Sequence, residues 1–474
     1  MRTTLLEQIQ NWVRDHREEL VEDLTELVKI RSVSEPDETY AMGAGCARCA
    51  DKAMEIGDKH GFRTENHDYY CVSLVLEGAG TGELGILGHM DVVPEGSGWS
   101  YPPYGAELHD GYMIGRGAGD NKGACVMSMY AMRCIRDLGL PMFHDVRLIL
   151  GFNEESGMRD VEHYLKVKKP PLFTIVCDGA WPMIIGEKGI LTANLTTTIT
   201  DDRILAFSGG ITSNSVPDSA WVRLRTDRRI SELGRREDIQ VQQIPEGLEI
   251  RAAGVACHAM APEGGKNAIL VLTEYLLEEN LLDGDSLRAV RFVHRVVSDY
   301  YGGGLGIENE DTISGKTTCI GGMICFEGGE LTLNINVRYA IRTARQAQKE
   351  RLLAACAGAG FRVEDFTDSG PRYMSAEEAP AAQLLKLYRR LTGDEAVPII
   401  MGGGTHARKF PNALPYGPGH WGFQGKFGGA HSVDEGVYLE HLTEAIPIYV
   451  AALLQLDCHY HPRDSMKLTE DYYV

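Results

Sequence analysis

Hydrophobic residues recur along this chain with two different periods, and the change of period predicts its elements. Between Leu5 and Val28 apolar residues return every three or four positions, which predicts an amphipathic helix. Short apolar runs at 84–89, 146–152 and 172–179 then alternate with helical segments such as 122–139. This alternation is typical of an α/β fold with a mostly parallel sheet and helices on both faces.

From about Glu187 onwards the apolar pattern changes to a period of two. In the segment 331–341, hydrophobic residues occupy every second position and alternate mainly with polar ones. Such a strand is expected where one face of a sheet packs on helices, and the apolar segment 266–282 predicts one of these helices. We therefore predict a second, α+β domain.

The order of these patterns predicts an interrupted domain. A stretch containing Pro, Gly and Ser at 367–375 follows the alternating strands, and a strongly apolar helix is predicted at 436–456. The simplest organisation is a first domain at 1–186, an inserted domain at 187–370, and a return to the first domain at 371–474.

Composition and charge narrow the set of partners. The net charge is −20 and no basic run occurs, so a nucleic-acid partner is not expected, because phosphate backbones are bound mainly by clustered Lys and Arg. The N-terminal segment lacks the uncharged apolar core of a signal peptide, and no run of about 18 apolar residues suggests a membrane span. The eleven scattered cysteines fit reduced thiols. We expect a cytoplasmic protein without a membrane partner.

Candidate chemistry follows directly after the apolar strands. His89 and Asp91 come after the first of these runs, Glu154 and Glu155 after the second, and Asp178 ends the third. In open α/β sheets ligands bind outside the carboxyl ends of the strands. We therefore expect these side chains to converge on one crevice.

Two further segments add ligands of the same kind. Asp120 lies in the Gly-rich segment 115–123, where a carboxylate would repel a phosphate and suits a cation better, and His431 lies at 428–436. Several carboxylates in one dry crevice repel one another unless cations compensate them. Histidine and carboxylate donors suit zinc or manganese, so the sequence predicts two divalent metal ions, zinc first and manganese as the alternative.

Five motifs, in order, carry a family resemblance over nearly the whole chain: "GHMDVVP", "GRGAGDNKG", "NEESG", "CDG" and "GGAHSVDE". They resemble those of the di-metal peptidases that include aminoacylases, carboxypeptidases and cytosolic dipeptidases. The resemblance implies that His89 and Asp178 hold one metal, Glu155 and His431 hold the other, and Asp120 bridges the two. It also implies that Asp91 orients the His89 ring, and that Glu154 is the general base for a metal-bridged hydroxide.

The inserted domain resembles the lid of this family, which is ferredoxin-like and extended here. By match with lid motifs, His258 would stabilise the oxyanion, and Asn214 and Arg338 would bind the carboxylate end of the substrate. The segment "MGGGTHAR" resembles a loop of the PepV-type (Sapep-like) cytosolic dipeptidases, which implies substrate contacts from Gly404 and Thr405. In that branch an extended lid replaces a partner subunit, so a monomer is expected.

Three functional hypotheses remain at this point. Asp178 and the long lid favour a dipeptidase that hydrolyses dipeptides or short peptides, and His406 stands where that branch more usually has Tyr. The alternative is an N-acyl amino-acid amidohydrolase, a deacetylase or desuccinylase, with the same metal site. A non-catalytic binding relative is the third hypothesis, and the presence of Glu154 beside a full ligand set opposes it.

Overall fold

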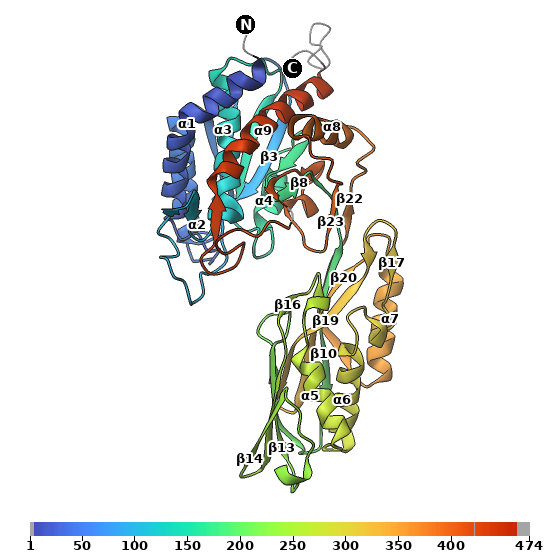
Figure 1. Cartoon of the computed structure of the whole chain (residues 1–474). Helices are drawn as coiled ribbons and strands as arrows, with labels where there is room; N and C mark the ends of the chain where they lie inside the picture. The colour runs from blue at the N-terminus through green and yellow to red at the C-terminus, as the bar shows by residue number, and fades with distance from the viewer. Residues whose placement is uncertain (1–3, 421, 462–474) are drawn as a thin grey trace. The chain divides into compact units, whose positions relative to one another are not determined.

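The computed structural model describes residues 4–420 and 422–461 and divides into two compact units (Figure 1). The first unit holds the described residues of Met1–Ile185, Met374–Ile399 and Gly404–Val474, and the second holds Gly186–Tyr373 and Ile400–Gly403. The second unit is thus inserted into the sequence of the first. Among the described residues, no helix combines the length and the apolar character needed to cross a membrane.

A six-stranded sheet forms the centre of the first unit, with the strand order β1-β2-β6-β3-β7-β24. Its strands are β1 (Arg63–His67), β2 (Cys71–Leu76), β3 (Glu83–His89), β6 (Asp145–Gly151), β7 (Thr174–Val176) and β24 (Ala413–Pro415). The pairings of β6 with β3, β3 with β7 and β7 with β24 are parallel, whereas β1 with β2 and β2 with β6 are antiparallel. The predicted mostly parallel sheet is confirmed, with an antiparallel hairpin at one edge.

Helices cover both faces of this sheet, as the sequence of β3 and β6 requires. Ile86 and Leu148 pack into a core built with α1 (Leu5–Val28), α2 (Ala44–Lys59), α3 (Gly123–Asp137), α8 (Ala381–Thr392) and α9 (Leu439–Tyr460). Their neighbours Leu87 and Ile149 pack on the opposite face with α4 (Arg159–Val167). Both strands are therefore continuous apolar runs, because successive side chains point to opposite, equally buried faces.

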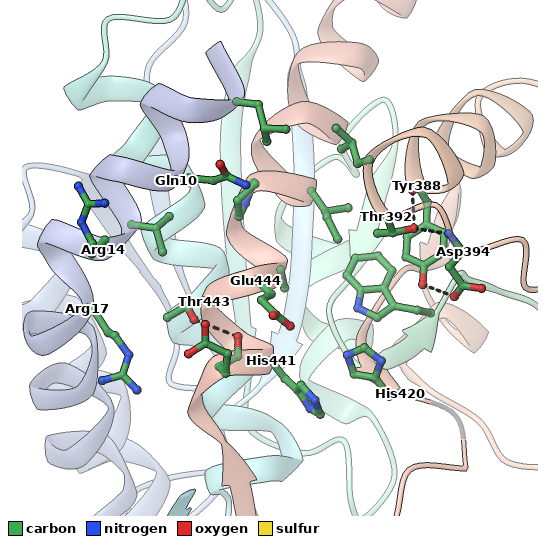
Figure 2. A pocket seen from close by; sticks show the side chains of 18 residues that line it. Gln10, Arg14, Arg17, Tyr388, Thr392, Asp394, His420, His441, Thr443 and Glu444 are labelled. Carbon is green, nitrogen blue, oxygen red and sulfur yellow. Dashed lines mark hydrogen bonds between the residues drawn. The ribbon is translucent and has the colours of Figure 1, made fainter. Parts of the chain in front are cut away.

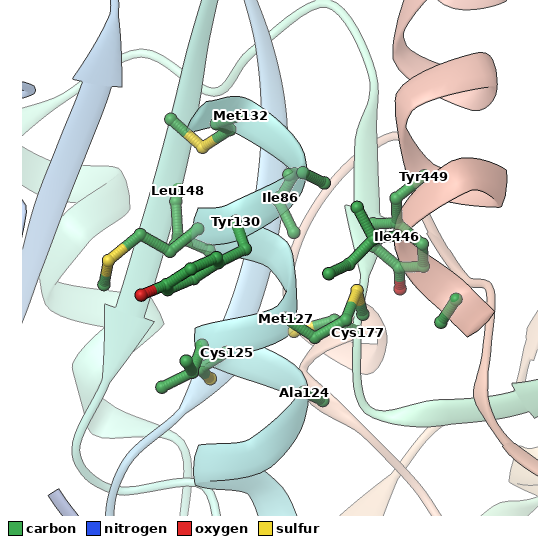
Figure 3. Packing of buried hydrophobic residues seen from close by; sticks show 14 of the residues in the cluster. Ile86, Ala124, Cys125, Met127, Tyr130, Met132, Leu148, Cys177, Ile446 and Tyr449 are labelled. Carbon is green, nitrogen blue, oxygen red and sulfur yellow. The ribbon is translucent and has the colours of Figure 1, made fainter. Parts of the chain in front are cut away.

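The larger core lies between the sheet and the pair α3 and α9 (Figure 3). Met127 and Tyr130 of α3 and Ile446 and Tyr449 of α9 are fully buried there. These two helices are apolar around much of their circumference because each packs on the sheet and on other helices. Their position brings the loops before α3 and before α9 to the carboxyl end of β3.

An eight-stranded antiparallel sheet forms the second unit, in the order β14-β15-β13-β11-β19-β20-β10-β21. Its strands are β10 (Gly189–Thr198), β11 (Ile204–Gly209), β13 (Ser219–Arg225), β14 (Ile239–Ile244), β15 (Gly247–Ala253), β19 (Thr318–Glu327), β20 (Glu330–Tyr339) and β21 (Arg362–Ser369).

The alternation predicted for 331–341 holds in the first half of β20, up to Ile335, whereas Asn336 and Arg338 further along the strand are buried as well. Leu331, Leu333 and Ile335 are buried in a core shared with α5 (Ala268–Glu278), α6 (Gly284–Val297) and α7 (Arg345–Gly358). The predicted α+β fold of this unit is thus confirmed.

Short strands complete both units. They are β4 (Glu107–His109), β5 (Tyr112–Ile114), β8 (Gly179–Trp181), β9 (Ile184–Glu187), β12 (Ser215–Val216), β16 (Cys257–His258), β17 (Glu310–Asp311), β18 (Gly315–Lys316), β22 (Arg372–Tyr373), β23 (Ile399–Met401), β25 (Pro418–His420) and β26 (Gly436–Tyr438). The chain passes between the units in the segments of β9, β22 and β23, which form one three-stranded sheet.

Candidate metal centre

His89 ends β3 and is held in one tautomer by the residue two positions further on. Its Nδ1 lies 2.9 Å from the backbone carbonyl oxygen of Asp91 and 3.5 Å from the Asp91 Oδ1. A carbonyl oxygen can only accept, so Nδ1 donates its proton there and Nε2 is the ring atom turned towards Asp120. The resemblance implied that the Asp91 side chain would do this, whereas the shorter contact comes from its backbone.

The Asp91 carboxylate instead anchors the two adjacent glutamates. Its Oδ1 accepts a hydrogen bond from the backbone N–H of Glu154, and its Oδ2 accepts one from that of Glu155, both at 3.1 Å. Asp91 is fully buried, so this contact ties the loop after β6 to the loop after β3. Asp91 therefore orients the His89 ring and fixes the backbone of both glutamates.

Asp120 lies between the two predicted metal-binding histidines. Its Oδ1 is 3.0 Å from His89 Nε2, and its Oδ2 is 3.3 Å from His431 Nε2. A carboxylate with one oxygen turned to each histidine has the geometry of a bridge between two cations. His431 Nε2 also lies 3.0 Å from Glu155 Oε2, which places these three residues around one position.

Asp178 completes the cluster on the side of His89. Its Oδ2 lies 3.9 Å from His89 Nε2, and its Oδ1 accepts a hydrogen bond of 3.4 Å from the Asn121 amide. Candidate ligand atoms lie within 4.8 Å of one another in two groups, which are His89 with Glu154 and Asp178, and His89 with Asp120 and Glu155. All of these residues belong to the first unit.

Charge in this cluster is not balanced by the protein. Burial raises the pKa of the Glu154 carboxyl well above its usual range, and burial together with Asp120 raises the pKa of Asp178 to about 7. Hydrogen bonds to Asp120 and Glu155 raise the pKa of His431 to about 10. Carboxylates that are this costly to ionise need added positive charge.

The donor set fits two divalent cations. Imidazole nitrogens and carboxylate oxygens are the ligands that zinc and manganese share, and the two groups of residues have His89 in common. The two groups contain no thiolate, and the Cys125 and Cys177 thiols contact the Asn121 Oδ1 instead. The first unit thus carries a candidate di-metal site.

Glu435 supports this site and was not singled out from the sequence. Its Oε1 accepts backbone hydrogen bonds from Gly117, Gly119 and Asp120 at 3.0–3.1 Å, and its Oε2 accepts one from Arg116 Nη1 at 2.5 Å. Arg116 and Glu435 are both buried. The available signal was an acidic residue four positions after His431, inside a motif whose histidine alone suggested a ligand.

The loop that carries His431 closes on itself, which explains one of its glycines. Gly428 and Glu435 form a parallel bridge, and the N–H groups of Gly428 and Gly436 donate within the loop. A Cβ atom at position 428 would lie 2.1 Å from the carbonyl oxygen of Val433, so only glycine fits. The closed loop presents His431, which is more than half exposed, towards Asp120 and Glu155.

His406 is buried against the helix that follows the two glutamates. Its Nε2 lies 3.0 Å from Asp160 Oδ2, and the same oxygen accepts the backbone N–H of Asn153. Its ring stands edge-on to His89, with centroids 6.2 Å apart. Thr405 is buried as well, and its Oγ1 accepts the N–H of Ala407, whereas Gly404 is partly exposed.

The remaining predicted residues belong to the second unit and lie close together there. His258 pairs with Ser215 between β16 and β12, and the Asn214 carbonyl accepts the N–H of Ala259. His258 and Asn214 are exposed. The His258 Nδ1 accepts the N–H of Met260, which fixes the orientation of the ring.

Arg338 is mostly buried in β20 and faces the same region of the second unit. Its Nε donates to the Asn336 Oδ1 at 2.8 Å, and its Nη1 donates to the Gly402 carbonyl at 3.2 Å. A Cβ atom at Gly402 would lie 2.5 Å from the Met260 Cβ, so the loop 400–403 lies against the His258 segment. Arg338, Gly402 and the His258 segment therefore form one polar cluster.

Known proteins resemble the chain over almost its full length. Residues 85–455 match the family model described as Peptidase family M20/M25/M40. The chain is 33% identical over 476 residues to a Bacillus subtilis (strain 168) protein named "Putative dipeptidase YtjP", with 94% of this chain and 99% of that protein covered. It is 30% identical over 465 residues to the Beta-Ala-Xaa dipeptidase of Lactobacillus delbrueckii subsp. lactis, with 93% and 96% covered.

Solved structures share the fold. Human carnosine dipeptidase 1 matches with a TM-score of 0.59 and 16% identity over 96% of this chain and 99% of that one. The di-peptidase Dug1p of Saccharomyces cerevisiae matches with a TM-score of 0.60 and 14% identity over 98% and 100%. These two structures share only the fold with the chain, whereas the family match and the sequence relatives show which family it belongs to. The chain belongs to Peptidase family M20/M25/M40, a family of metal-dependent peptidases.

Proposed function

We propose that this protein is a metal-dependent dipeptidase that hydrolyses dipeptides or short peptides. One observation supports this most directly: two groups of metal-ligand atoms share His89, which contacts Asp120, and the partly buried Glu154 belongs to one of the groups. The names of the sequence relatives describe dipeptidases, and we extend that activity to this chain.

Within this proposal, each ligand has a defined place. His89 and Asp178 hold one cation, Glu155 and His431 hold the other, and Asp120 bridges them. The contacts of Asp120 with both histidines, and of His431 with Glu155, support this division. Divalent ions bound here would polarise the substrate carbonyl and lower the pKa of a water molecule.

Glu154 is the proposed general base. Its backbone is fixed by Asp91, and burial raises the pKa of its carboxyl, so it binds a proton more tightly than an exposed glutamate does. It takes the proton from the attacking water and then donates it to the amine that leaves when the C–N bond breaks. Glu155 is adjacent in sequence but contacts His431, so the two side chains serve different tasks.

The second unit supplies the proposed recognition groups, as a lid to the catalytic first unit. His258 stabilises the oxyanion, and Arg338 and Asn214 bind the substrate carboxylate. Gly404 and Thr405, which belong to the first unit, add further contacts. The clustering of Arg338 with the His258 segment supports this assignment. Because one chain carries all of these residues, we also propose a monomer, which predicts sedimentation at the 52.2 kDa of one chain.

A substrate panel tests the proposal. Metal-stripped protein would be supplied with zinc or manganese and given free dipeptides, the same dipeptides with an acetylated amino end, and N-acetyl and N-succinyl amino acids. We expect turnover of the free dipeptides, because Asp178 and the long second unit favour peptides. Turnover restricted to the acylated amino acids would instead establish the amidohydrolase alternative.

A further inference from the structure

Asn121 stands between two of the proposed metal ligands without being one of them. It follows the proposed bridge Asp120, lies two residues before α3 and is almost fully buried. Its side-chain amide reaches His89 at the end of β3 and Cys177 just after β7, and these two strands are parallel neighbours in the sheet. A buried amide in this position can hold the ends of both strands, and the side chains that follow them, at a fixed distance.

The contacts of the amide fix its orientation. Its oxygen accepts the backbone N–H of His89 at 3.4 Å and the thiols of Cys125 and Cys177 at 3.5 and 3.8 Å. Its nitrogen donates to the backbone carbonyl oxygen of Cys177 at 3.0 Å. A carbonyl can only accept and a backbone N–H can only donate, so a rotated amide would lose both backbone contacts. The amide nitrogen therefore faces the segment that carries Asp178.

The same nitrogen determines which oxygen of Asp178 is turned towards His89. It donates to the Asp178 Oδ1 at 3.4 Å, whereas the Asp178 Oδ2 lies 3.9 Å from the His89 Nε2. Among the described residues, no other hydrogen bond reaches this carboxylate. One oxygen is thus held by the amide, and the other is left to face His89.

Glycine at position 88 permits this close approach. A Cβ atom there would lie 2.8 Å from the Asn121 Oδ1 and 2.6 Å from the sulfur atoms of Cys125 and Cys177. Close-packed interiors do not tolerate such distances, so a larger residue would push the amide away from β3. The residue before His89 is therefore adapted to the amide of Asn121.

These contacts concern one of the two cation positions of the proposed function. His89 and Asp178 are the proposed ligands of one cation, and the amide of Asn121 contacts both residues. Glu155 and His431, the proposed ligands of the other, lie 3.0 Å apart. Within the described part of the chain, neither of these two forms a hydrogen bond with Asn121. Loss of the amide should therefore affect the two positions unequally.

We propose that Asn121 is the positioning residue of the cation held by His89 and Asp178, and that it sets the affinity of this position while leaving that of the other. The proposal rests on the division of ligands in the proposed function. The competing explanation is structural: the amide would only satisfy the Cys177 carbonyl and the thiols. Its loss would then destabilise the first unit without distinguishing between the two positions.

Zinc titration of metal-stripped protein against a chromogenic chelator tests this without any substrate. The native chain should bind two zinc ions. Asn121→Leu keeps the branched shape of the side chain and has no amide. It should bind one zinc ion as the native chain does, and its affinity for the second should fall by about 10- to 100-fold. Asn121→Ala is the second variant, in case the apolar branch disturbs the fold, and the same result is expected.

Double variants show which position is affected. Glu155→Ala alone should lose the other cation, so Asn121→Leu combined with Glu155→Ala should bind no zinc ion at native affinity. Asn121→Leu combined with Asp178→Asn should still bind one, because both changes act at the same position. Glu155→Ala alone tests the division of ligands in the proposed function, whereas Asn121→Leu alone tests this proposal, so the two can fail separately.

Thr443→Val is the control for a hydrogen bond lost elsewhere in the first unit. Thr443 is buried on α9, donates through Oγ1 to the Glu440 carbonyl at 2.9 Å and lines the pocket shown in Figure 2. Among the described residues that line this pocket, none belongs to the metal centre. The variant should bind two zinc ions with native affinity, and urea unfolding of the metal-stripped proteins checks that each variant is folded.

Three results would overturn the proposal. The first is native affinity of both Asn121 variants for two zinc ions. The second is an equal loss of affinity at both positions in folded protein. The third is a zinc ion retained at native affinity when Asn121→Leu and Glu155→Ala are combined, because the two changes would then act at one position.

Discussion

The Oε1 of Glu435 lies 3.0 Å from the backbone nitrogen of Asp120 and accepts its N–H. The same oxygen accepts the N–H groups of Gly117 and Gly119, while Oε2 pairs with Arg116. Glu435 follows His431 by four residues, so one side chain links the segment of one proposed ligand to the loop of the proposed bridge. Its carboxylate therefore fixes where Asp120 stands.

Glu435→Gln should loosen the metal site without removing a ligand. The amide leaves Arg116 buried and without its carboxylate, which predicts a loss of about 3–5 kcal/mol in the free energy of unfolding. Metal affinity should fall by about 10- to 100-fold, as for other residues that orient ligands. Denaturant unfolding and metal titration measure the two effects.

Asp434→Asn is the matched control for this variant. Asp434 is adjacent in sequence but accepts hydrogen bonds from the N–H groups of Ser100 and Tyr101, away from the Asp120 loop. It should retain the metal affinity of the native chain. Equal losses of affinity in both variants would mean that Glu435 acts on the loop as a whole and does not position Asp120.

The two adjacent glutamates should respond differently to substitution. Glu154→Gln should keep two metals bound while dipeptide hydrolysis falls by about two to four orders of magnitude, because only proton transfer is lost. Glu155→Ala should lose one metal, because its carboxylate pairs with His431. Metal content per chain and initial rates measure both. Equal metal loss in the two variants would show that the roles are assigned wrongly.

Removal of the metals should give the stability a new pH dependence. In the protein without cations the pKa of Asp178 is about 7, above its ordinary value of 3.8, so between these values the folded state binds more protons than the unfolded state. Stability contributed by this carboxyl is then full below about pH 4 and is lost as the pH rises towards 7. Each tenfold difference in proton affinity between the folded and unfolded states corresponds to about 1.4 kcal/mol of this loss.

Chelated and metal-loaded protein should therefore diverge as the pH increases. Unfolding by urea from pH 5 to pH 8 measures this, and Asp178→Asn is the control, because the amide cannot titrate. We expect the chelated Asp178→Asn variant to show a flatter profile than the chelated native chain. Parallel profiles for native and variant protein would contradict the raised pKa.

Asp160 should be essential for the fold around His406. Its Oδ2 contacts His406 Nε2 and the N–H of Asn153, and both side chains are buried completely. Asp160→Ala leaves His406 and this N–H without their acceptor, so we expect a loss of about 3–5 kcal/mol in the free energy of unfolding. Glu162→Ala, on the same helix but paired with Lys409 at the surface, should cost less than about 1 kcal/mol. Similar losses in both variants would contradict this.

Much of the architecture could be predicted because it depends on local periodicity. In β3 and β6 a continuous apolar run indicates that both faces of the strand are buried. In the first half of β20 the alternation indicates that one face is buried, and this difference identifies the type of sheet. The strand-end positions of His89, Glu154, Glu155 and Asp178 could also be predicted, since parallel strands bring their carboxyl ends to one edge. The antiparallel pairing of β2 with β6 could not, because β6 is remote from β2 in sequence and the direction of the pairing depends on it.

Which residues hold the side chains of the site in place was decided by the tertiary structure alone. The sequence determined which residue types reach the carboxyl edge of the sheet, and its motifs indicated the family. Only the folded chain placed the Asp91 carbonyl on His89, Glu435 under the Asp120 loop and Asp160 beside His406. These contacts join segments hundreds of residues apart or use backbone atoms, which carry no side-chain signal.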